Sequence, residues 1–502
     1  MTQTARPVKR ASSPNTSDSL ISLNPDTGDI VGVFQVHDAD AVAAAVARAR
    51  AASQWWQGQG FAGRKAALLR WASFLVARSE EFSSLVTREN GKPDADAYLE
   101  LILALEHVRW AAKNAEAALK SRSVAPGPLM ANFAASVEYK ALGVVGVIGP
   151  WNYPIYTPMG SLAYALAAGN TVVFKPSEYT TAIGTYLVDA FAAANPEAPD
   201  GVLTLVTGYG ATGAALCASG VDKIAFTGST ATGKKIMAAC AETLTPVLLE
   251  CGGKDALIVA EDADVPAAAQ AAAFGAMANA GQTCVGVERV YVVEAVRDEF
   301  LTALRRELEG VCAGKDYGPM TMPGQVDVVR RHVEDAIASG AELLVGGVES
   351  IGERCVDPIV LVDADESCSA VQEETFGPTV TVRTVKDVDE AIELTNNSEY
   401  GLGSTVYSKR HGMDIARRIN AGQTSVNAPL AFAAIPALPF GGIGQSGFGR
   451  IHGQEGLREF ARPHSIARQR FTVPGMALLT FDRNAITMRL VRHVVSLRHS
   501  IR

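Results

Sequence analysis

The sequence lacks the features that mark disulfide-rich proteins, metalloproteins and nucleic-acid-binding proteins. Its 502 residues include seven cysteines, an odd number, and no Cys-x-x-Cys pair, so we expect reduced thiols in a cytoplasmic protein. Its eight histidines form no His-x-x-x-His or Cys/His cluster, which argues against a metal site. A formal net charge of −8 argues against nucleic acid as a partner.

Apolar runs suited to crossing a membrane are missing as well. Residues 141–174 carry no charge, but glycines and prolines recur through them and would break a helix, so we expect a buried strand, a turn and a helix there. Residues 1–20 are polar and have no apolar core of a signal peptide, so we expect a disordered start. The remaining composition, 48% hydrophobic and 20% charged, is typical of a globular protein of two or three domains.

The order of apolar segments predicts an α/β fold. Strands are expected at 171–174, 203–206, 223–226 and 246–249, with helices between them at 180–193, 211–218 and 232–240. This rhythm is typical of βαβ units in a parallel sheet with helices on both faces. A helix at 265–280 and a second α/β set follow. The two halves meet near Gly252, where we expect a cofactor cleft.

Cys284 and Glu250 are the most informative residues. Cys284 follows Gln282 and Thr283, and Glu250 precedes a Cys-Gly-Gly-Lys turn. A thiolate can add to a carbonyl and hold the product as a thioester, and a carboxylate can activate the water that releases it. Each residue alone is weak evidence, because a single cysteine is more often a small buried hydrophobe.

Two glycine-rich turns resemble nucleotide-binding motifs. Residues 208–213 read GYGATG after an expected strand, but no acidic partner follows at the right distance, so a tight strand-to-helix turn is an equal interpretation. Residues 228–234 read GSTATGK, although Lys235 stands where a P-loop needs Ser or Thr. The alternative function from a different class of protein is therefore a P-loop ATPase. The second turn can still receive a pyrophosphate at a helix N-terminus.

Seven motifs in order make the chain resemble the aldehyde dehydrogenase superfamily. They are PWNYP at 150–154, KPSE at 175–178, FTGS at 226–229, ECGGK at 250–254, GQTC at 281–284, EETFGP at 373–378 and PFGG at 439–442. The resemblance runs from about residue 21 to 466. It implies a Rossmann-type cofactor domain (21–122 and 142–252), a catalytic α/β domain (253–445) and a small β oligomerisation element (123–141 and 461–471). A homodimer or homotetramer is implied.

The resemblance also assigns roles to residues. It implies that Cys284 is the nucleophile, that the Asn152 amide and the Cys284 backbone N–H form an oxyanion hole, and that Glu250 activates water. The presence of Glu250 argues against relatives that acylate coenzyme A. The implied cofactor is NAD, with NADP as the alternative, because Glu178 would repel a 2′-phosphate. The implied cofactor-binding residues are Trp151, Lys175, Ser177, Glu178, Gly208, Gly228, Ser229, Gly252, Glu374 and Phe376.

The substrate is the least determined feature. Succinic-semialdehyde members of the superfamily place arginines where this chain has Gly160 and Ala278, and a substrate carboxylate would lack a bidentate partner without them. The side chains expected around the aldehyde favour an apolar aliphatic or aromatic one: Tyr153, Tyr156, Met159 and Val285. Succinic semialdehyde remains the alternative, with Arg289 as a substitute cation.

Two features depart from the resemblance. Cys251 stands where the superfamily usually has leucine, which raises the hypothesis of a Cys251–Cys284 disulfide on oxidation. Residues 472–502 extend past the usual end, and residues 484–501 combine helical apolar spacing with arginines. We expect this amphipathic helix to pack on a neighbouring subunit or over a substrate tunnel, ahead of contact with a membrane surface.

Overall fold

The computed structural model describes residues 19–472, 480–481 and 483–500, which form two compact units. The first consists of Met1–Ala118 and Ala141–Ala461, and the second of Leu119–Lys140 and Arg462–Arg502. Most of the expected disordered start, residues 1–18, lies outside the described residues. Ser19 and Leu20 correct that expectation, because they begin strand β1 and the Leu20 side chain is buried.

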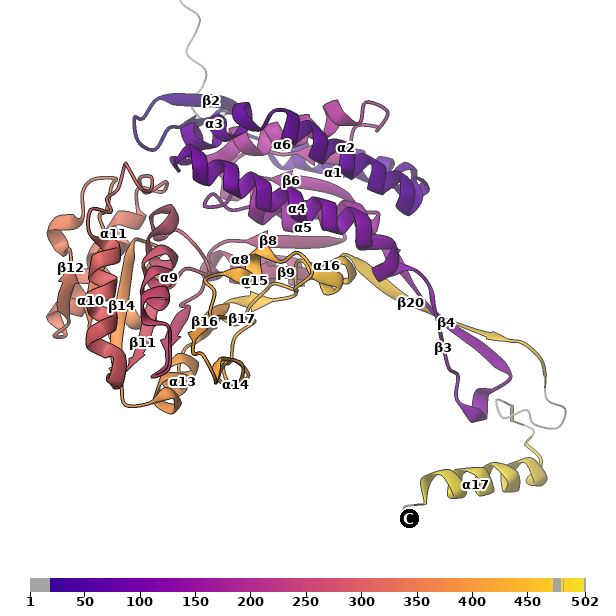
Figure 1. The fold of residues 1–502 in the computed structure, drawn as a ribbon. Helices are drawn as coiled ribbons and strands as arrows, with labels where there is room; N and C mark the ends of the chain where they lie inside the picture. Colours follow the sequence, from indigo (N-terminus) through magenta and orange to yellow (C-terminus); the bar gives the residue numbers. More distant parts are fainter. Residues whose placement is uncertain (1–18, 473–479, 482, 501–502) are drawn as a thin grey trace, which may run out of the picture. The chain divides into compact units, whose positions relative to one another are not determined.

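The first unit begins with a hairpin and four helices (Figure 1). The hairpin pairs β1 with β2 in antiparallel register, Ile21 opposite Val33. The Asp38 side chain caps the first helix by accepting from the Ala41 N–H at 2.9 Å. These elements are β1 (Ser19–Leu23), β2 (Ile30–Gln35), α1 (Ala39–Gly58), α2 (Gly60–Ala77), α3 (Ser79–Asn90) and α4 (Asp94–Leu119).

A six-stranded sheet follows, in the order β19-β9-β8-β5-β6-β7. Strands β9, β8, β5, β6 and β7 are parallel, and the edge strand β19 pairs antiparallel with β9. Strand β5 is buried along its whole length, as expected where helices cover both faces. The strands are β5 (Val144–Ile148), β6 (Thr171–Lys175), β7 (Leu203–Leu205), β8 (Lys223–Thr227), β9 (Val247–Glu250) and β19 (Gly447–Phe448). The interleaved helices are α5 (Tyr156–Ala168), α6 (Thr181–Ala194), α7 (Gly210–Ala218) and α8 (Thr230–Ala241).

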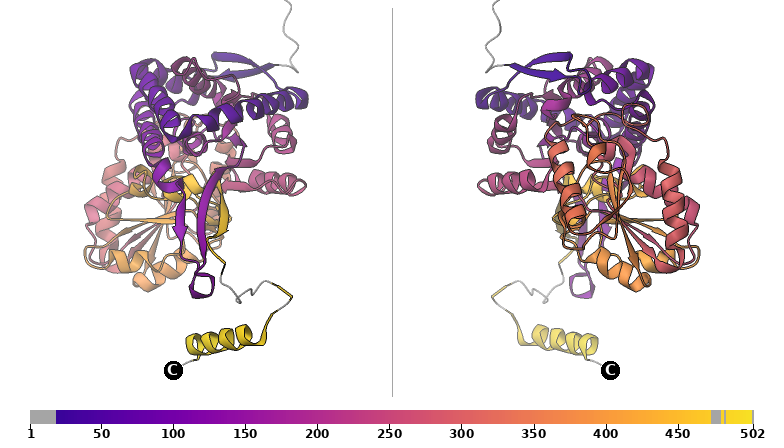
Figure 2. Two further views of the ribbon diagram at one scale, coloured as in Figure 1. Left: turned by 90° about the vertical axis from the view of Figure 1, so that its right-hand side faces the viewer. Right: turned by 90° about the vertical axis from the view of Figure 1, so that its left-hand side faces the viewer.

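A second, seven-stranded sheet has the order β12-β13-β14-β11-β10-β16-β17 and is parallel except for β12. One apolar core joins α9, α10 and α11 to one face, and another joins α13 and α14 to the other face (Figure 2). The strands are β10 (Ala256–Val259), β11 (Arg289–Val293), β12 (Glu342–Val345), β13 (Ile359–Val362), β14 (Thr379–Val385), β16 (Gly403–Tyr407) and β17 (Gln423–Val426). The helices are α9 (Val265–Met277), α10 (Arg297–Leu308), α11 (Gln325–Ala338), α13 (Val388–Asn396) and α14 (Gly412–Ala416).

Shorter elements connect these layers. Strand β15 pairs antiparallel with β18, and the chain then returns to the first sheet as β19. The shorter elements are α12 (Ser369–Gln372), β15 (Tyr400–Gly401), α15 (Ala431–Ala434), β18 (Ile443–Gly444) and α16 (Gly453–Glu459). The expected α/β architecture with two parallel sheets is confirmed, and the chain passes from the first sheet to the second between Glu250 and Ala256.

The second unit contains a three-stranded sheet and a helix. The sheet has the order β20-β4-β3, and β3 pairs antiparallel with β4. Its strands are β3 (Arg122–Val124), β4 (Phe133–Ala141) and β20 (Ala461–Gln469), and the helix is α17 (Ala485–His499). Each helix in the described parts of the chain is too short or too polar to cross a membrane.

Candidate active site

A cavity of about 570 Å³ opens where parallel strands β5, β6, β8 and β9 end. Carboxyl ends of parallel strands are the usual place for a ligand site in such sheets. The catalytic and cofactor-binding residues that the sequence proposed lie on the wall of this cavity, except Gly208: Trp151, Asn152, Lys175, Ser177, Glu178, Gly228, Ser229, Glu250, Gly252, Cys284, Glu374 and Phe376. The structure therefore brings together residues that are more than 200 positions apart.

Gly208 is absent from the described lining of the cavity. Gly210 and Gly213 of the same turn line it. Gly208 has a φ of +148°, and an added Cβ would lie 2.1 Å from the Thr212 hydroxyl oxygen. Only glycine fits this close approach, so Gly208 shapes the turn from β7 to α7.

The loop that carries Cys284 begins earlier than expected. Helix α9 ends at Met277, because Asn279 and Ala280 have φ values of +55° and +56° in a following 3₁₀ turn. Gly281 closes this turn, and a Cβ there would lie 2.0 Å from the Gly377 carbonyl oxygen. After this early end of the helix, the loop brings Cys284 to the wall of the cavity.

The Cys284 thiol and the Glu250 carboxyl group influence each other. Burial raises the pKa of Cys284 well above its ordinary value, and the charges of Glu250 and Glu374 raise it further. Burial also raises the pKa of Glu250 to about 7, against the opposing effect of the Cys284 thiol and the Thr227 hydroxyl. The free protein thus holds a protonated thiol beside a carboxyl group that can exchange a proton near neutral pH.

Asn152 is fixed against the Cys284 loop. Its amide nitrogen donates to the Gln282 carbonyl at 2.9 Å, which leaves its second N–H for a ligand. The backbone carbonyl of Asn152 accepts from Lys92 Nζ and from the side-chain amide of Asn279, each at 3.0 Å. The amide is therefore oriented by the backbone of the loop that carries the thiol.

Lys92 and Glu100 support this arrangement and were not identified from the sequence. They form an ion pair with both side chains almost fully buried. Glu100 also accepts from the N–H groups of Ile155 and Tyr156, at 2.7 and 3.0 Å, where helix α5 begins. The one available signal was a charged residue inside the otherwise apolar run of α4.

Replacing Glu100 with alanine tests this support. We expect the free energy of unfolding to fall by about 3 kcal/mol, because the Lys92 ammonium is left buried without its partner. Urea unfolding measures the change, and Glu106→Ala on the exposed side of the same helix is the control. Equal midpoints for the two variants would contradict a structural role for the pair.

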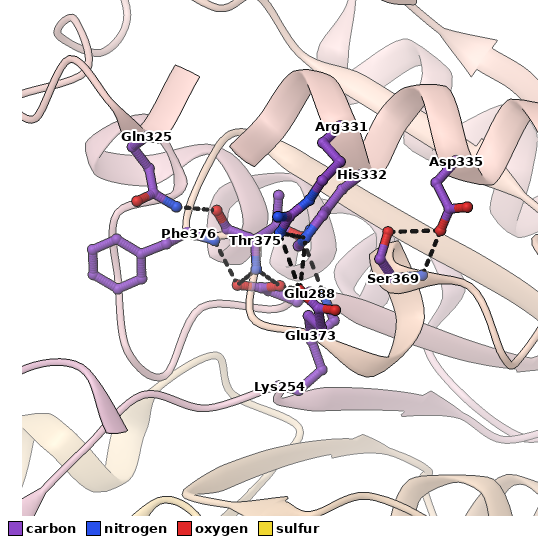
Figure 3. Close-up of polar contacts among 10 residues, drawn as sticks. All are labelled: Lys254, Glu288, Gln325, Arg331, His332, Asp335, Ser369, Glu373, Thr375 and Phe376. Atoms are coloured by element: carbon purple, nitrogen blue, oxygen red, sulfur yellow. Dashed lines mark hydrogen bonds and ion pairs between the residues drawn. The ribbon is translucent and has the colours of Figure 1, made fainter. Parts of the chain in front are cut away.

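A second buried pair positions Phe376. Glu288 pairs with Lys254 and accepts from the N–H groups of Thr375 and Phe376, at 2.8 and 3.0 Å (Figure 3). Gln325 donates to the Thr375 carbonyl at 2.7 Å. The Phe376 backbone has a φ of +52°. Glu288, another residue that the sequence did not reveal, thus holds a strained loop at the wall of the cavity.

Aromatic and acidic groups form the part of the cavity wall around Phe376. The Phe376 ring lies 5.5 Å from the Trp151 ring in a perpendicular arrangement. Glu374 accepts from the Gly253 N–H at 3.0 Å, and burial raises its pKa to about 8. A Cβ on Gly252 would lie about 2 Å from this carboxyl group, so glycine is required there.

Charged and polar side chains also line the cavity. Lys175 Nζ lies 3.9 Å from Glu178 Oε2, and the Glu178 side chain is about one third exposed. Ser229 caps α8 by accepting from the Thr232 N–H at 3.3 Å. Lys235 lines the cavity, whereas Lys234, the lysine of the P-loop-like sequence, is absent from its described lining.

Tyrosines and a histidine surround the side of the site at helix α5. Tyr153 shares a hydrogen bond with the Thr283 hydroxyl at 3.0 Å, and Tyr156 donates to the Ala433 carbonyl at 2.7 Å. Gly160 faces His452, and a Cβ on Gly160 would lie 2.7 Å from His452 Nε2. An arginine at position 160 has no room while His452 is in place.

The Arg289 side chain is not part of the described lining of the cavity. Its guanidinium donates to the backbone carbonyls of Lys254, Leu394 and Thr395, and the described lining contains no arginine. Four hydrogen bonds engage its guanidinium, and Arg289 is absent from that lining, so its position gives no support to the expectation that it holds a substrate carboxylate. Cys251 and Cys284 are both free thiols, and an added Cβ on Gly233 of α8 would lie 2.9 Å from Cys251 Sγ.

Comparison with known proteins agrees with this geometry. A family model described as "Aldehyde dehydrogenase family" matches residues 12–466. The chain is 36% identical over 464 residues to a 4,4'-diapolycopene aldehyde oxidase of Methylomonas sp, covering 91% of this chain and 87% of that protein. A crystal structure of an NAD-dependent aldehyde dehydrogenase from Sinorhizobium meliloti has a TM-score of 0.87 at 33% identity, covering 94% and 95% of the two chains. A crystal structure of an NADP-dependent enzyme of E. coli has a TM-score of 0.86 at 30% identity, covering 91% of this chain and 95% of that chain. The chain belongs to the aldehyde dehydrogenase family.

Proposed function

We propose that this aldehyde dehydrogenase oxidises apolar aldehydes to carboxylic acids with NAD, through a thioester on Cys284. The observation that carries the proposal is the shared cavity. Cys284, Glu250 and Asn152 line the same cavity as Lys175, Glu178 and Ser229. A nucleophile, a base and an amide donor in one cavity with groups that can bind ribose and phosphate suit a reaction between an aldehyde and a dinucleotide.

The cavity fits a dinucleotide on three observations. Its volume lies within the usual range for cofactor sites. The N-terminus of α8 faces it through Ser229, and helix N-termini bind phosphate groups. Glu178 at its edge can accept from two ribose hydroxyls and would repel a 2′-phosphate, which favours NAD over NADP. Glu374 and Phe376 would hold the nicotinamide end.

The proposed reaction has two halves, formation of a thioester on Cys284 and its hydrolysis. Cys284 sulfur attacks the carbonyl carbon, and its proton leaves to a base for which Glu250 is placed. Asn152 and the Cys284 N–H stabilise the oxyanion of the resulting thiohemiacetal. A nicotinamide held in the cavity would supply the hydride acceptor, and loss of hydride from the thiohemiacetal carbon leaves a thioester on Cys284. Glu250 releases its first proton to solvent and then takes a proton from water, which attacks the thioester. The acid leaves, and the Cys284 sulfur takes up a proton to restore the thiol.

The described side chains support an apolar substrate. Tyr153, Tyr156 and Val285 lie around the thiol side of the site, and Arg289 is engaged elsewhere. One relative is named for an aldehyde of diapolycopene, which fits this preference. Succinic semialdehyde stays the alternative, although no arginine lines the described cavity.

Absorbance of the reduced nicotinamide tests the proposed function. We expect NAD to be reduced faster than NADP, and hexanal or phenylacetaldehyde to give a higher kcat/KM than succinic semialdehyde. A higher kcat/KM for succinic semialdehyde would support the alternative. Absence of turnover with every aldehyde, in protein that still binds NAD, would contradict the proposal.

Gly160→Ala tests the packing of the substrate side. We expect it to lower the free energy of unfolding by about 1–3 kcal/mol, because the new methyl group overpacks against His452. Gly58→Ala in α1, where an added Cβ meets nothing within 4 Å, is the matched control and should be neutral or stabilising. Urea unfolding compares the two. A stabilised Gly160→Ala variant would contradict the prediction, because it would show that the His452 side chain moves away at little cost in free energy.

A further inference from the structure

Helix α17 of the second unit is the most distinctive surface element that the proposed reaction does not use. It runs from Ala485 to His499, and the Asn484 side chain caps it by accepting from the Thr487 N–H at 2.7 Å. A side-chain cap at its first turn gives the helix a defined start.

An apolar strip runs along α17 and is exposed. Ile486, Leu490 and Leu497 are 81%, 47% and 72% exposed. Their spacings of four and seven residues place them on one side of the helix, one and two turns apart. Phe481, just before the helix, is fully exposed. An apolar strip of this length on a surface helix marks a contact site.

The charge of α17 is of one sign. Residues 483–500 contain four arginines, two histidines and no acidic residue, in a chain whose net charge is −8. Arg489, Arg492 and Arg498 form no ion pair with any described residue. By helical position, Arg489 and Arg498 flank the apolar strip on its two sides. Cations in this position can reach anionic groups while the strip is buried.

We propose that α17 binds the surface of an anionic lipid bilayer. An apolar strip flanked by arginines matches the boundary between acyl chains and headgroups, where an amphipathic helix lies in the plane of the membrane. The complementary charge is that of anionic headgroups. The helix is too short and too charged to cross the bilayer. This inference is independent of which aldehyde the enzyme oxidises.

Sedimentation of the full-length protein with lipid vesicles tests the proposal. We expect binding to vesicles of phosphatidylglycerol and phosphatidylcholine, weak binding to phosphatidylcholine alone, and loss of binding at high salt. Leu490→Glu should abolish binding. Arg489→Gln with Arg498→Gln should weaken it about tenfold or more, since each arginine contributes to attraction at an anionic surface.

Matched controls separate lipid binding from other effects. Met413→Glu changes an exposed apolar residue of α14 and should bind vesicles as the wild type does. Hexanal oxidation in solution should be equal in all variants, which shows that they are folded. Wild-type protein that ignores anionic vesicles would overturn the proposal. So would α17 variants that retain vesicle binding or that change only the oligomeric state, which would identify a second copy as the occupant.

Discussion

Replacing Cys284 with alanine is expected to abolish aldehyde oxidation, lowering kcat/KM by roughly 10³-fold or more. The variant keeps the cavity and the cofactor-binding residues but has no sulfur to form a bond with the aldehyde carbon. NAD binding should therefore remain, as measured by quenching of protein fluorescence, while reduction of NAD by hexanal falls to background.

Cys251→Ala is the matched control for this prediction. Cys251 lines the same cavity and is also a free thiol, with its pKa raised to about 12 by burial. Because the Cys251 sulfur packs against Gly233 of α8 and lies outside the loop that holds the Asn152 amide, we expect its loss to leave turnover almost unchanged. Equal losses in the two variants would show that the cavity wall, and not the Cys284 sulfur, limits the reaction.

Replacing Glu250 with glutamine is expected to slow turnover by about 10²–10⁴-fold, because a general base is lost. The amide preserves size and shape, so the first formation of thioester should be less affected than its hydrolysis. Rapid mixing should show one equivalent of NADH formed per active site, followed by a slow steady state. A uniform loss with no initial burst would show that Glu250 limits a step before hydride loss, and would contradict a main role in hydrolysis.

The pH dependence follows from the environment of Glu250. Burial raises the pKa of this carboxyl group to about 7, and only its charged form can accept a proton. Activity should therefore fall as the pH decreases through about 7, and this inflection should be missing from Glu250→Gln. A wild-type profile that is flat between pH 6 and 8 would contradict the assignment.

The sequence predicted the residues of the site better than the groups that hold them. Cys284, Glu250 and Glu178 follow strands or glycine turns whose local patterns are readable, and parallel strands bring their carboxyl ends together. Lys92 and Glu288 act through partners 60 and more than 80 positions away, Asn152 and Phe376. No local pattern reports such contacts, because they arise only when separate elements pack.

Backbone conformation explains the remaining differences. An alanine-rich pattern through residue 280 predicted an unbroken helix, yet Asn279 and Ala280 adopt left-handed conformations that contact with the Gly377 loop imposes through Gly281. Gly208 is expected from its motif to contact the cofactor, and its φ and its approach to Thr212 show that the turn itself also needs a glycine there. Both cases show tertiary packing overriding local propensity.

Mass spectrometry of Glu250→Gln after mixing with NAD and hexanal tests the central claim most directly. The account predicts that the peptide carrying Cys284 gains the mass of a hexanoyl group in place of the thiol hydrogen, and that hydroxylamine removes it. An unmodified Cys284 peptide in protein that has reduced NAD, or an acyl group on another cysteine, would contradict the account.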